Sequence, residues 1–381
     1  MASLCAEGDV VDAAAAAAAD DGLHDVMEAF PEFDPGKEVS YNDLQLFTNN
    51  FSKENKIGRT QFGLLYRGTV PQGWKGGIDD ERAVTVKMWE TKSIGPNGKF
   101  FHVKPEYILA RMKDEIRFLG LPSLQSNPFV GKVEAYCFEE NKLGVVYDVK
   151  PLDTIYNIIR DEDKFGWRNR VKVALGLARF LSFCHGNAPK YLVRNLSAAH
   201  VIVDQEFNPV LVDFAMILGG GIGDDRAPES CAVPLTSYGY LDCHIILCGV
   251  WTNGTDVYTF GVILLELIMK HTSRQVALVL KENRPVSLAD AAVCYYEKQL
   301  AEAKNGKVKC LFPTKRKKKV KCSFVHECLR DDPDFDADDG TELTRLAVSC
   351  FAVMQYKRPS MEEIICELEK LHVIVKHAGM P

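Results

Sequence analysis

The chain has 381 residues, 46% of them hydrophobic, so it can bury a large core, and this length is ordinary for one two-lobed unit. Its net charge of −6 at pH 7 gives no bulk attraction to nucleic acid or to anionic lipid, so we expect no nucleic-acid partner. The apolar stretch 260–269 is interrupted by Glu266 and is too short to cross a bilayer, so we expect no transmembrane segment.

The twelve cysteines are scattered from Cys5 to Cys366 without any CxxC pair. With no charged-then-apolar leader ahead of them, we expect reduced thiols in a cytoplasmic protein. The first residues lack the glycine at position 2 that myristoylation requires. Palmitoylation of Cys5 is the alternative to a free thiol in a loose tail.

The N-terminal segment 1–35 is of low complexity and contains seven consecutive alanines, Ala13–Ala19. A bare alanine run has no amphipathic face to bury, so this segment is predicted to be a disordered tail. We assign residues 36–150 to a β-rich lobe with a lead-in helix, 151–376 to a helical lobe, and 377–381 to a C-terminal tail.

Local patterns divide the rest of the chain into strands first and helices later. The first elements expected are a short amphipathic helix at 43–47, a glycine-punctuated strand pair at 57–68, a strand at 83–87, a helix with Ile108, Met112, Ile116 and Leu119 on one face, and strands at 130–138 and 143–149. Helical periodicity then dominates at 168–185, 254–270, 286–303, 341–355 and 360–376. The pattern predicts an α+β protein.

A glycine-containing loop between the first two strands is the first feature that carries chemistry. Ile57 and Gly58 begin it and Gly63 ends it, with Thr60 at the position of the middle glycine in a GxGxxG loop. Glycine lets a backbone approach phosphate groups closely. A lone glycine loop is weak support for nucleotide binding, so the residues that follow it decide the interpretation.

Lys87 ends an apolar strand about two dozen residues later, and Glu115 follows on the amphipathic helix. A Lys–Glu pair orients a lysine toward nucleotide phosphates. Lys87 alone would be an ordinary surface lysine at a strand end, but the order and spacing of the three features favour a nucleotide site.

From about residue 40 to 375 the chain resembles the plant receptor-like cytoplasmic kinases and their wall-associated relatives. The segments that carry the resemblance are 49–52, 127–130, 166–170, 239–242, 256–262 and 357–361. The resemblance implies a bilobal protein-kinase fold with the cleft between the lobes and a hinge at Tyr147, Asp148 and Val149. It also implies ATP as cofactor, with Mg²⁺ or Mn²⁺ weakly held.

The catalytic loop departs from the family pattern His-Arg-Asp-Leu-Lys-x-x-Asn. Asn195 stands at the place of the catalytic carboxylate, and an amide cannot accept a hydroxyl proton at neutral pH. Ser197 replaces the lysine that meets the γ-phosphate. His200 replaces the asparagine that holds a second Mg²⁺, an ion that prefers oxygen ligands. Arg194 is retained, although its histidine and aspartate neighbours are not.

Two further segments match the family pattern only in part. Asp213 is kept as the metal-binding aspartate, but Ala215 replaces the glycine that follows Phe214. Cys243 and His244 stand where Pro-Glu is expected, so Arg358 loses its usual carboxylate partner, and either another acid substitutes or the arginine stays hydrated.

These departures favour a catalytically impaired pseudokinase that acts as an adaptor, decoy or scaffold in plant receptor-kinase or immune signalling. Active kinases or immune receptors are then its expected partners, and peripheral attachment to the plasma membrane would come through them. The alternative is an active Ser/Thr kinase with a divergent loop. Nucleotide binding is a separate question, which Lys87 and Asp213 favour and Thr60 disfavours because its branched side chain stiffens the loop.

Arg194 suggests regulation by phosphate. An arginine at this position can bind a phosphorylated residue of the activation segment, or it can tie the loop together through packing and hydrogen bonds. The candidate acceptors are Ser230, Thr236, Ser237, Tyr238 and Tyr240.

Three surface segments complete the analysis. The basic run 315–321 is either a solvated loop or a targeting signal, with the loop favoured. The acidic run 331–339 is expected to be structural. Residues 91–104 are expected to form a flexible loop, or else a partner contact.

Overall fold

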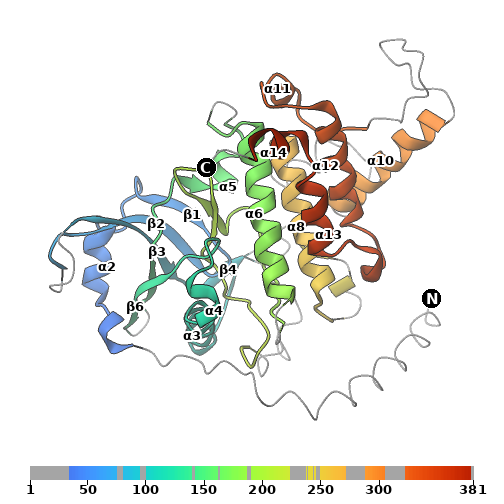
Figure 1. Ribbon diagram of the computed structural model, residues 1–381. Coiled ribbons are helices and arrows are strands. Elements are labelled where there is room, and N and C mark those ends of the chain that lie inside the picture. Colours follow the sequence, from blue (N-terminus) through green and yellow to red (C-terminus); the bar gives the residue numbers. More distant parts are fainter. Residues whose placement is uncertain are drawn as a thin grey trace.

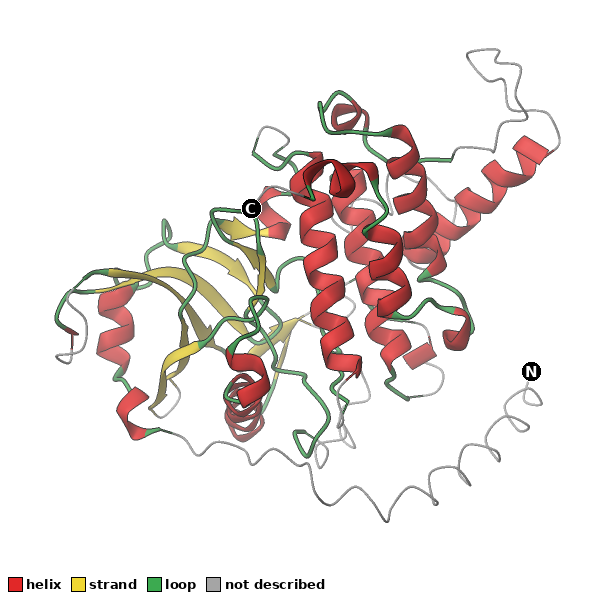
Figure 2. Cartoon of the chain, viewed as in Figure 1, coloured by secondary structure: helices red, strands yellow, loops and turns green. Residues whose placement is uncertain are grey.

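The computed structural model describes residues 34–74, 80–94, 100–139, 142–161, 164–186, 190–223, 237, 239–242, 244–245, 249–271, 288–304 and 322–378. These residues form a β-rich lobe and a helical lobe, joined after Tyr147 (Figures 1 and 2). The predicted α+β, bilobal architecture is confirmed. Residues 1–33 of the tail expected at 1–35, and the basic run at 315–321, lie outside the described residues.

The β-rich lobe is built on one five-stranded antiparallel sheet. Its strands, in spatial order, are β1 (Lys56–Arg59), β2 (Gly63–Val70), β3 (Arg82–Trp89), β7 (Lys142–Tyr147) and β6 (Val133–Glu139). Side chains alternate between the faces of a strand. On β3, Val84 and Val86 therefore pack into one apolar cluster, and Lys87 points from the opposite face toward the cleft.

Helix α2 (Tyr41–Phe47) covers the face of the sheet that lies away from the helical lobe (Figure 1). It begins at a capping box, in which Asp43 N donates to Ser40 Oγ and Ser40 N donates to the Asp43 carboxylate. Its buried residues Leu44 and Phe47 join the cluster of Val84 and Val86. Before it lies the short 3-10 helix η1 (Pro35–Lys37).

The opposite face of the sheet carries α3 (Pro105–Leu119), followed by the short α4 (Pro122–Gln125). Proline at the first turn of α3 suits a helix start, because its missing N–H would be unpaired there. The expected loop at 91–104 is wrong in part: β4 (Lys92–Ile94) and β5 (Phe100–His102) pair as antiparallel strands. Backbone pairing orders both ends of this segment.

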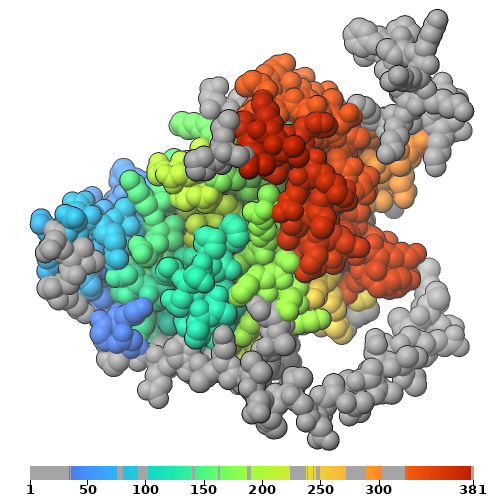
Figure 3. Space-filling model, viewed as in Figure 1, coloured from blue at the N-terminus to red at the C-terminus, as the bar shows by residue number. Residues whose placement is uncertain are grey.

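The helical lobe places a small sheet against a bundle of helices. The sheet has the order β10 (Pro209–Leu211), β9 (Val201–Val203), β8 (Asp153–Thr154). The helices are α5 (Ile155–Ile158), α6 (Trp167–Gly186), α8 (Asn253–Met269), α10 (Leu288–Lys304), α11 (Glu327–Arg330), α12 (Ala337–Ser349), α13 (Met361–Leu368) and α14 (His372–His377), with the 3-10 helix η4 (Gln355–Lys357). In the space-filling view the last helices, in red, lie at the end of the molecule opposite the blue lobe (Figure 3).

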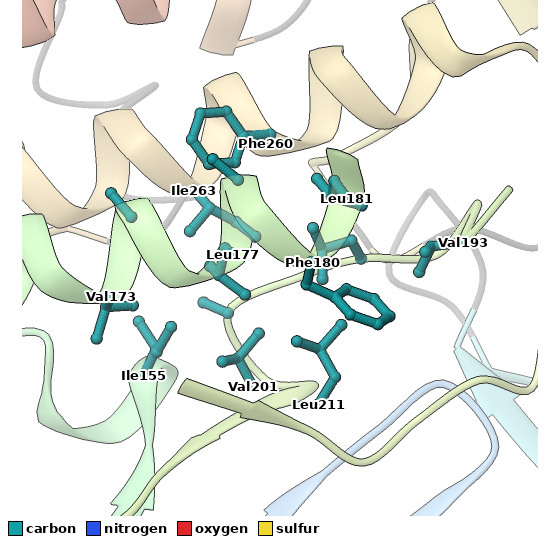
Figure 4. Packing of buried hydrophobic residues seen from close by; sticks show 14 of the residues in the cluster. Ile155, Val173, Leu177, Phe180, Leu181, Val193, Val201, Leu211, Phe260 and Ile263 are labelled. Atoms are coloured by element: carbon teal, nitrogen blue, oxygen red, sulfur yellow. The ribbon is translucent and has the colours of Figure 1, made fainter. Parts of the chain in front are cut away.

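The core of the helical lobe lies between α6, α8 and the small sheet. Figure 4 shows Leu177 and Phe180 of α6 between Phe260 of α8 and the sheet residues Val201 and Leu211. All five side chains are fully buried, and each contributes about 1.5–3 kcal/mol of hydrophobic free energy.

Close packing of α8 against α12 requires a glycine. A Cβ at Gly261 would lie 2.6 Å from Cys350 Cβ, closer than two carbon atoms can approach. Alanine at this position would therefore force the two helices apart.

Two predicted helix boundaries are wrong. The helix expected at 341–355 ends at Ser349, and the one expected at 360–376 is divided into α13 and α14. Asp339 explains the division, because its carboxylate accepts hydrogen bonds from the backbone N–H groups of His372 and Val373 and so starts α14 anew.

The acidic run is structural, as predicted. Asp336 caps α12 by accepting from Asp338 N, Asp332 accepts from Trp167 N at 2.7 Å, and Asp334 pairs with Lys376 at 2.7 Å. Among the described helices none is both long and apolar enough to span a membrane.

Candidate functional site

The cleft between the lobes contains a buried cluster of Lys87, Glu115 and Asp213. Strand β3 supplies the lysine, α3 the glutamate, and the segment after β10 the aspartate. Lys87 Nζ lies 2.8 Å from Glu115 Oε2 and 3.0 Å from Asp213 Oδ1. The lysine and glutamate side chains are completely buried and that of Asp213 is 1% exposed. The structure thus brings together the residues that sequence spacing predicted to be neighbours.

Three further groups hold this cluster in place. The hydroxyl of Tyr147, the last residue of β7, donates to Glu115 Oε1. The backbone N–H of Phe214 donates to Glu115 Oε2 at 2.7 Å. The Trp89 ring lies 3.7 Å from Lys87 Nζ in a cation–π contact. Glu115 is therefore bonded at both oxygens, so α3 is locked against the sheet and against the segment that bears Asp213.

The pKa values of the two carboxyl groups in this cluster are shifted in opposite directions. Burial raises the pKa of Glu115, although the Lys87 ammonium opposes this effect. Burial also acts to raise the pKa of Asp213, but Lys87, His200 and the Ala215 N–H together outweigh it, and the pKa falls to about 2. Asp213 is therefore a carboxylate at neutral pH.

The glycine loop is folded tightly onto β3. Ile57 and Gly58 lie on β1, and Gly63 begins β2. Phe62 at the tip is fully buried and stacks on Trp89, with ring centroids 6.4 Å apart. Its carbonyl accepts from Glu90 N at 2.7 Å. The loop is thus packed against the same tryptophan that covers Lys87.

The first strand of this loop also contacts the helical lobe directly. Asn157 Nδ2 of α5 donates to Ile57 O at 2.6 Å. A Cβ at Gly58 would lie 3.3 Å from the methyl group of Thr154. Nucleotide phosphates lie beneath a kinase glycine loop. The hydrogen bond from Asn157 joins β1 to the helical lobe at this edge of the cleft.

The predicted hinge is the connection between β7 and β8. Tyr147 is the end of β7, Asp148 N donates to Lys132 O at 2.9 Å, and Val149 N donates to Tyr147 O at 2.8 Å. Val149 O accepts from Thr85 Oγ1 at 3.0 Å. The fully buried Thr85 thereby ties the hinge to β3, a contact that the sequence analysis did not identify.

The catalytic loop keeps its main-chain course through Asp256 of α8. The carboxylate of Asp256 accepts from Val193 N and Arg194 N, both at 2.9 Å. Arg194 has a positive φ of 64°, and its Nε donates to Met216 O at 2.6 Å. Its guanidinium lies 5.6 Å from the centroid of the Trp251 ring. These contacts are those of an arginine that ties the loop to the next segment.

Asn195 faces the segment that follows Asp213 in the chain. Its Oδ1 accepts from Ser237 N at 2.9 Å and from Ser237 Oγ at 3.1 Å. Its Nδ2 is buried and has no hydrogen-bond partner among the described residues, and the same is true of Ser197 Oγ. The amide therefore receives a hydroxyl hydrogen bond without being able to take the proton.

His200 lies at the floor of the cleft beside Asp213. Its Nδ1 donates to Asn195 O at 2.5 Å, and its Nε2 lies 3.7 Å from Asp213 Oδ2. Burial lowers the pKa of His200. Mg²⁺ demands octahedral oxygen ligands, and this pair offers one carboxylate oxygen and one imidazole nitrogen. The donor set does not fit Mg²⁺.

The question of a partner for Arg358 is resolved by Asp242. Arg358 Nη1 lies 2.5 Å from Asp242 Oδ2, and both side chains are buried. Substitution by another acid, one of the two expected outcomes, is confirmed. The acid stands two residues before His244, so the chain keeps the buried pair although it lacks the usual glutamate.

The described candidate phosphate acceptors are already engaged. Tyr240 is buried and donates to Glu266 Oε2, while its oxygen accepts from Ala198 N. Ser237 is bonded to Asn195. Ser230, Thr236 and Tyr238 lie outside the described residues. Phosphate recognition by Arg194 stays a prediction.

Four contacts of the site escaped sequence reasoning: those of Tyr147, Thr85, Asp242 and Asp256. Tyr147 was assigned to the hinge, but its hydroxyl bond to Glu115 crosses from strand to helix. Contacts of this kind join residues far apart in the chain, and residue type alone does not pair them. The signal for Asp242 was an arginine without its usual partner, which predicted either another acid or a hydrated arginine and did not identify the acid.

The family of the chain follows from comparison with known proteins. A profile described as protein tyrosine and serine/threonine kinase matches residues 51–368. Since this match covers most of the chain, the protein belongs to the protein kinase family.

Similar plant proteins are named as serine/threonine-protein kinases or receptor-like cytoplasmic kinases. Serine/threonine-protein kinase PBL36 of Arabidopsis thaliana is 30% identical over 60% of this chain and 45% of its own length. Receptor-like cytoplasmic kinase 176 of Oryza sativa is 26% identical over 88% of this chain and 76% of its own length. An EPD1-interacting receptor-like cytoplasmic kinase of Nicotiana benthamiana is 27% identical over 77% and 60%, respectively. The alignment spans about half the length of PBL36 and similar Arabidopsis relatives.

Proposed function

We propose that this kinase-family protein is catalytically impaired and acts as an adaptor, decoy or scaffold for other signalling proteins. The observation that carries the proposal is Asn195, whose amide oxygen accepts hydrogen bonds from Ser237 at the position of the catalytic base. Loss of a general base typically costs about 10²–10⁴ in rate. Ser197 and His200 add the loss of a phosphate-binding charge and of an oxygen ligand in the same loop.

Nucleotide binding is proposed to be weak and to require opening of the cleft. Lys87, Glu115 and Asp213 favour binding, because they form the charged cluster that receives phosphates and a cation. The bond from Asn157 to Ile57 O and the contact between Thr154 and Gly58 oppose it. ATP with Mg²⁺ or Mn²⁺ would have to displace these contacts before reaching Lys87.

Support for an adaptor role comes from the outer surface near η4. Val353, Met354 and Tyr356 are 78%, 53% and 81% exposed, and Val250 on the neighbouring loop is 54% exposed. An exposed apolar group of this kind is typical of a protein contact. We propose active kinases or immune receptors as the partners, in the cytoplasm and, through those partners, at the plasma membrane.

The second candidate function is that of an active Ser/Thr protein kinase. The intact Lys87–Glu115 pair at 2.8 Å favours it, as do relatives that carry kinase names. An active kinase would need another proton acceptor or a mechanism that tolerates an amide at position 195.

Transfer of labelled γ-phosphate by the purified full-length chain separates the two functions. The wild-type protein is expected to incorporate no more phosphate than a Lys87→Met variant, with either Mg²⁺ or Mn²⁺. Both proteins must show cooperative thermal unfolding, since Lys87→Met leaves two buried carboxylates without their cation. Lys87-dependent incorporation with either metal would establish an active kinase and refute the proposal.

A further inference from the structure

A groove of about 660 Å³ opens on the surface of the helical lobe where α8 begins. Its walls come from the segment before the catalytic loop, from the residues at the start of α8, and from η4. Its apolar lining consists of Leu192, Leu218, Trp251 and Tyr356. Tyr356 is 81% exposed, and Val353, just before η4, is 78% exposed. Apolar side chains exposed around a concave surface are typical of a site that receives another segment of protein.

Hydrogen bonds hold the walls of this groove in place. Thr252 Oγ1, at the start of α8, donates to Gln355 Oε1 of η4 at 2.7 Å. Leu192 and Leu218 exchange two backbone hydrogen bonds, at 2.8 and 3.0 Å. A surface that is already ordered loses less conformational entropy when it is occupied. The groove is therefore formed before anything binds in it.

The charge at the groove favours an acidic occupant. Lys190 lines it and is exposed, and none of the described residues that line it is an acid. The 17-residue helix α8 begins in it at Asn253, and the N-terminus of a helix carries partial positive charge. A second groove, beside α3, is instead lined by one lysine and by the three glutamates Glu90, Glu106 and Glu139. An acidic segment would therefore prefer the groove at α8.

Residues 20–34 of this chain have the matching chemistry. The stretch contains six acidic residues and no lysine or arginine, and all of it except Asp34 lies outside the described residues. Four of its apolar residues recur at the spacing i, i+3, i+4, i+7, which places side chains on one face of a helix: Leu23, Val26, Met27 and Phe30. A segment that is predicted to be disordered by itself can fold when it binds such a surface.

We propose that residues 23–30 of this chain dock in the groove at the start of α8. The apolar residues of the segment then contact Trp251 and Tyr356, and its carboxylates face Lys190. Docking does not depend on whether the chain transfers phosphate. The docked segment would also cover the apolar surface next to η4 that is proposed above for partners, and this consequence alone rests on the proposed adaptor function.

Photo-crosslinking of the full-length protein tests the docking. With p-benzoylphenylalanine in place of Phe30, crosslinks are expected at the groove, in residues 190–192, 251–254 or 355–356, where mass spectrometry locates them. The size of the product shows whether the groove belongs to the same copy or to a second copy, and the occupant is the same segment in both cases. Crosslinks that concentrate in the groove beside α3, or that do not reach the helical lobe, would overturn the proposal.

Two exposed tyrosines give a matched pair of variants. Tyr356→Ala is expected to lower the crosslink yield at least about 5-fold, because interface aromatics commonly dominate binding. Tyr156→Ala, which removes a tyrosine outside the groove that is 53% exposed, is expected to leave the yield unchanged. Thermal unfolding checks that both variants are folded. Equal yields in the two variants would refute docking at Tyr356.

A charge exchange tests the orientation of the acidic residues. Lys190→Glu is expected to lower the crosslink yield by about 2–5-fold, since a single exposed charge pair contributes little. Asp25→Lys and Glu28→Lys, added together to Lys190→Glu, are expected to restore the yield because the two charges are again opposite. A combined variant with no higher yield than Lys190→Glu would contradict the placement of this acidic segment at Lys190.

Discussion

The two walls of the cleft differ in how closely their residues match the family's phosphotransfer pattern. On the β-rich side, Lys87 and Glu115 are paired and fully buried, with Tyr147 bonded to the glutamate. On the helical side, Asn195 and His200 occupy the loop whose backbone Asp256 holds. The course of the loop depends on main-chain groups bonded to one buried carboxylate, so its side chains can change without loss of the fold.

The cluster around Lys87 has a structural role that is separate from any role in catalysis. The cluster around Lys87 stabilises the packing of α3 on the sheet, since three bonds converge on Glu115. Catalysis requires in addition a proton acceptor on the other wall. The Lys87–Glu115 pair can therefore be explained by packing alone, and its presence does not show that the chain transfers phosphate.

The largest expected effect comes from restoring the altered wall. The triple variant Asn195→Asp, Ser197→Lys, His200→Asn is expected to raise phosphate transfer by at least about 10²-fold, because it returns the proton acceptor. Transfer of labelled γ-phosphate measures the gain, and the same triple variant with Lys87→Met is the control. A folded triple variant that stays silent would place the defect in Thr60 or Ala215 instead.

The buried pair of Arg358 and Asp242 is expected to contribute strongly to the stability of the altered wall. Asp242→Asn leaves a buried guanidinium unpaired and should lower the free energy of unfolding by about 3–5 kcal/mol. Denaturant unfolding measures the loss. The exposed pair of Arg345 and Glu342 is the control, since Glu342→Gln should cost about 1 kcal/mol or less. Equal losses in the two variants would contradict the structural role of Asp242.

On the retained wall, Tyr147→Phe removes the hydroxyl that donates to Glu115. A hydrogen bond to a charged group contributes about 1.5–3 kcal/mol, and that much stability should be lost in urea or thermal unfolding. Tyr156→Phe is the control, because Tyr156 is 53% exposed. No loss in Tyr147→Phe would mean that Glu115 is held by Lys87 and Phe214 N alone.

The smallest expected effect concerns closure of the cleft between the two walls. Asn157→Ala removes one hydrogen bond to Ile57 O, worth about 0.5–1.5 kcal/mol, so ATP affinity should rise about 2–10-fold. Fluorescent nucleotide titration measures this change. Asn55→Ala, which removes a similar bond within the β-rich lobe, should leave the affinity unchanged. Equal affinities in Asn157→Ala and wild type would show that this bond does not restrain nucleotide entry.

The sequence by itself determined the elements and the pairing of Lys87 with Glu115. Period-two and helical patterns record burial locally, so they located α2, β3, α3, α6 and α8. Spacing between a glycine loop, a strand lysine and a helix glutamate was enough to predict the buried ion pair. The altered residues of the catalytic loop could likewise be read directly, because the family pattern assigns a role to each position.

Tertiary structure alone decided which distant residues complete these groups. Asp242 for Arg358 and Tyr147 for Glu115 are chosen by three-dimensional proximity, because a buried charge takes whichever partner packing brings near. The division of 360–376 into two helices has the same origin, since the capping residue Asp339 comes from another helix. Residue type shows which buried charged or polar groups require a partner. Only the packing of the chain determines which residue that partner is.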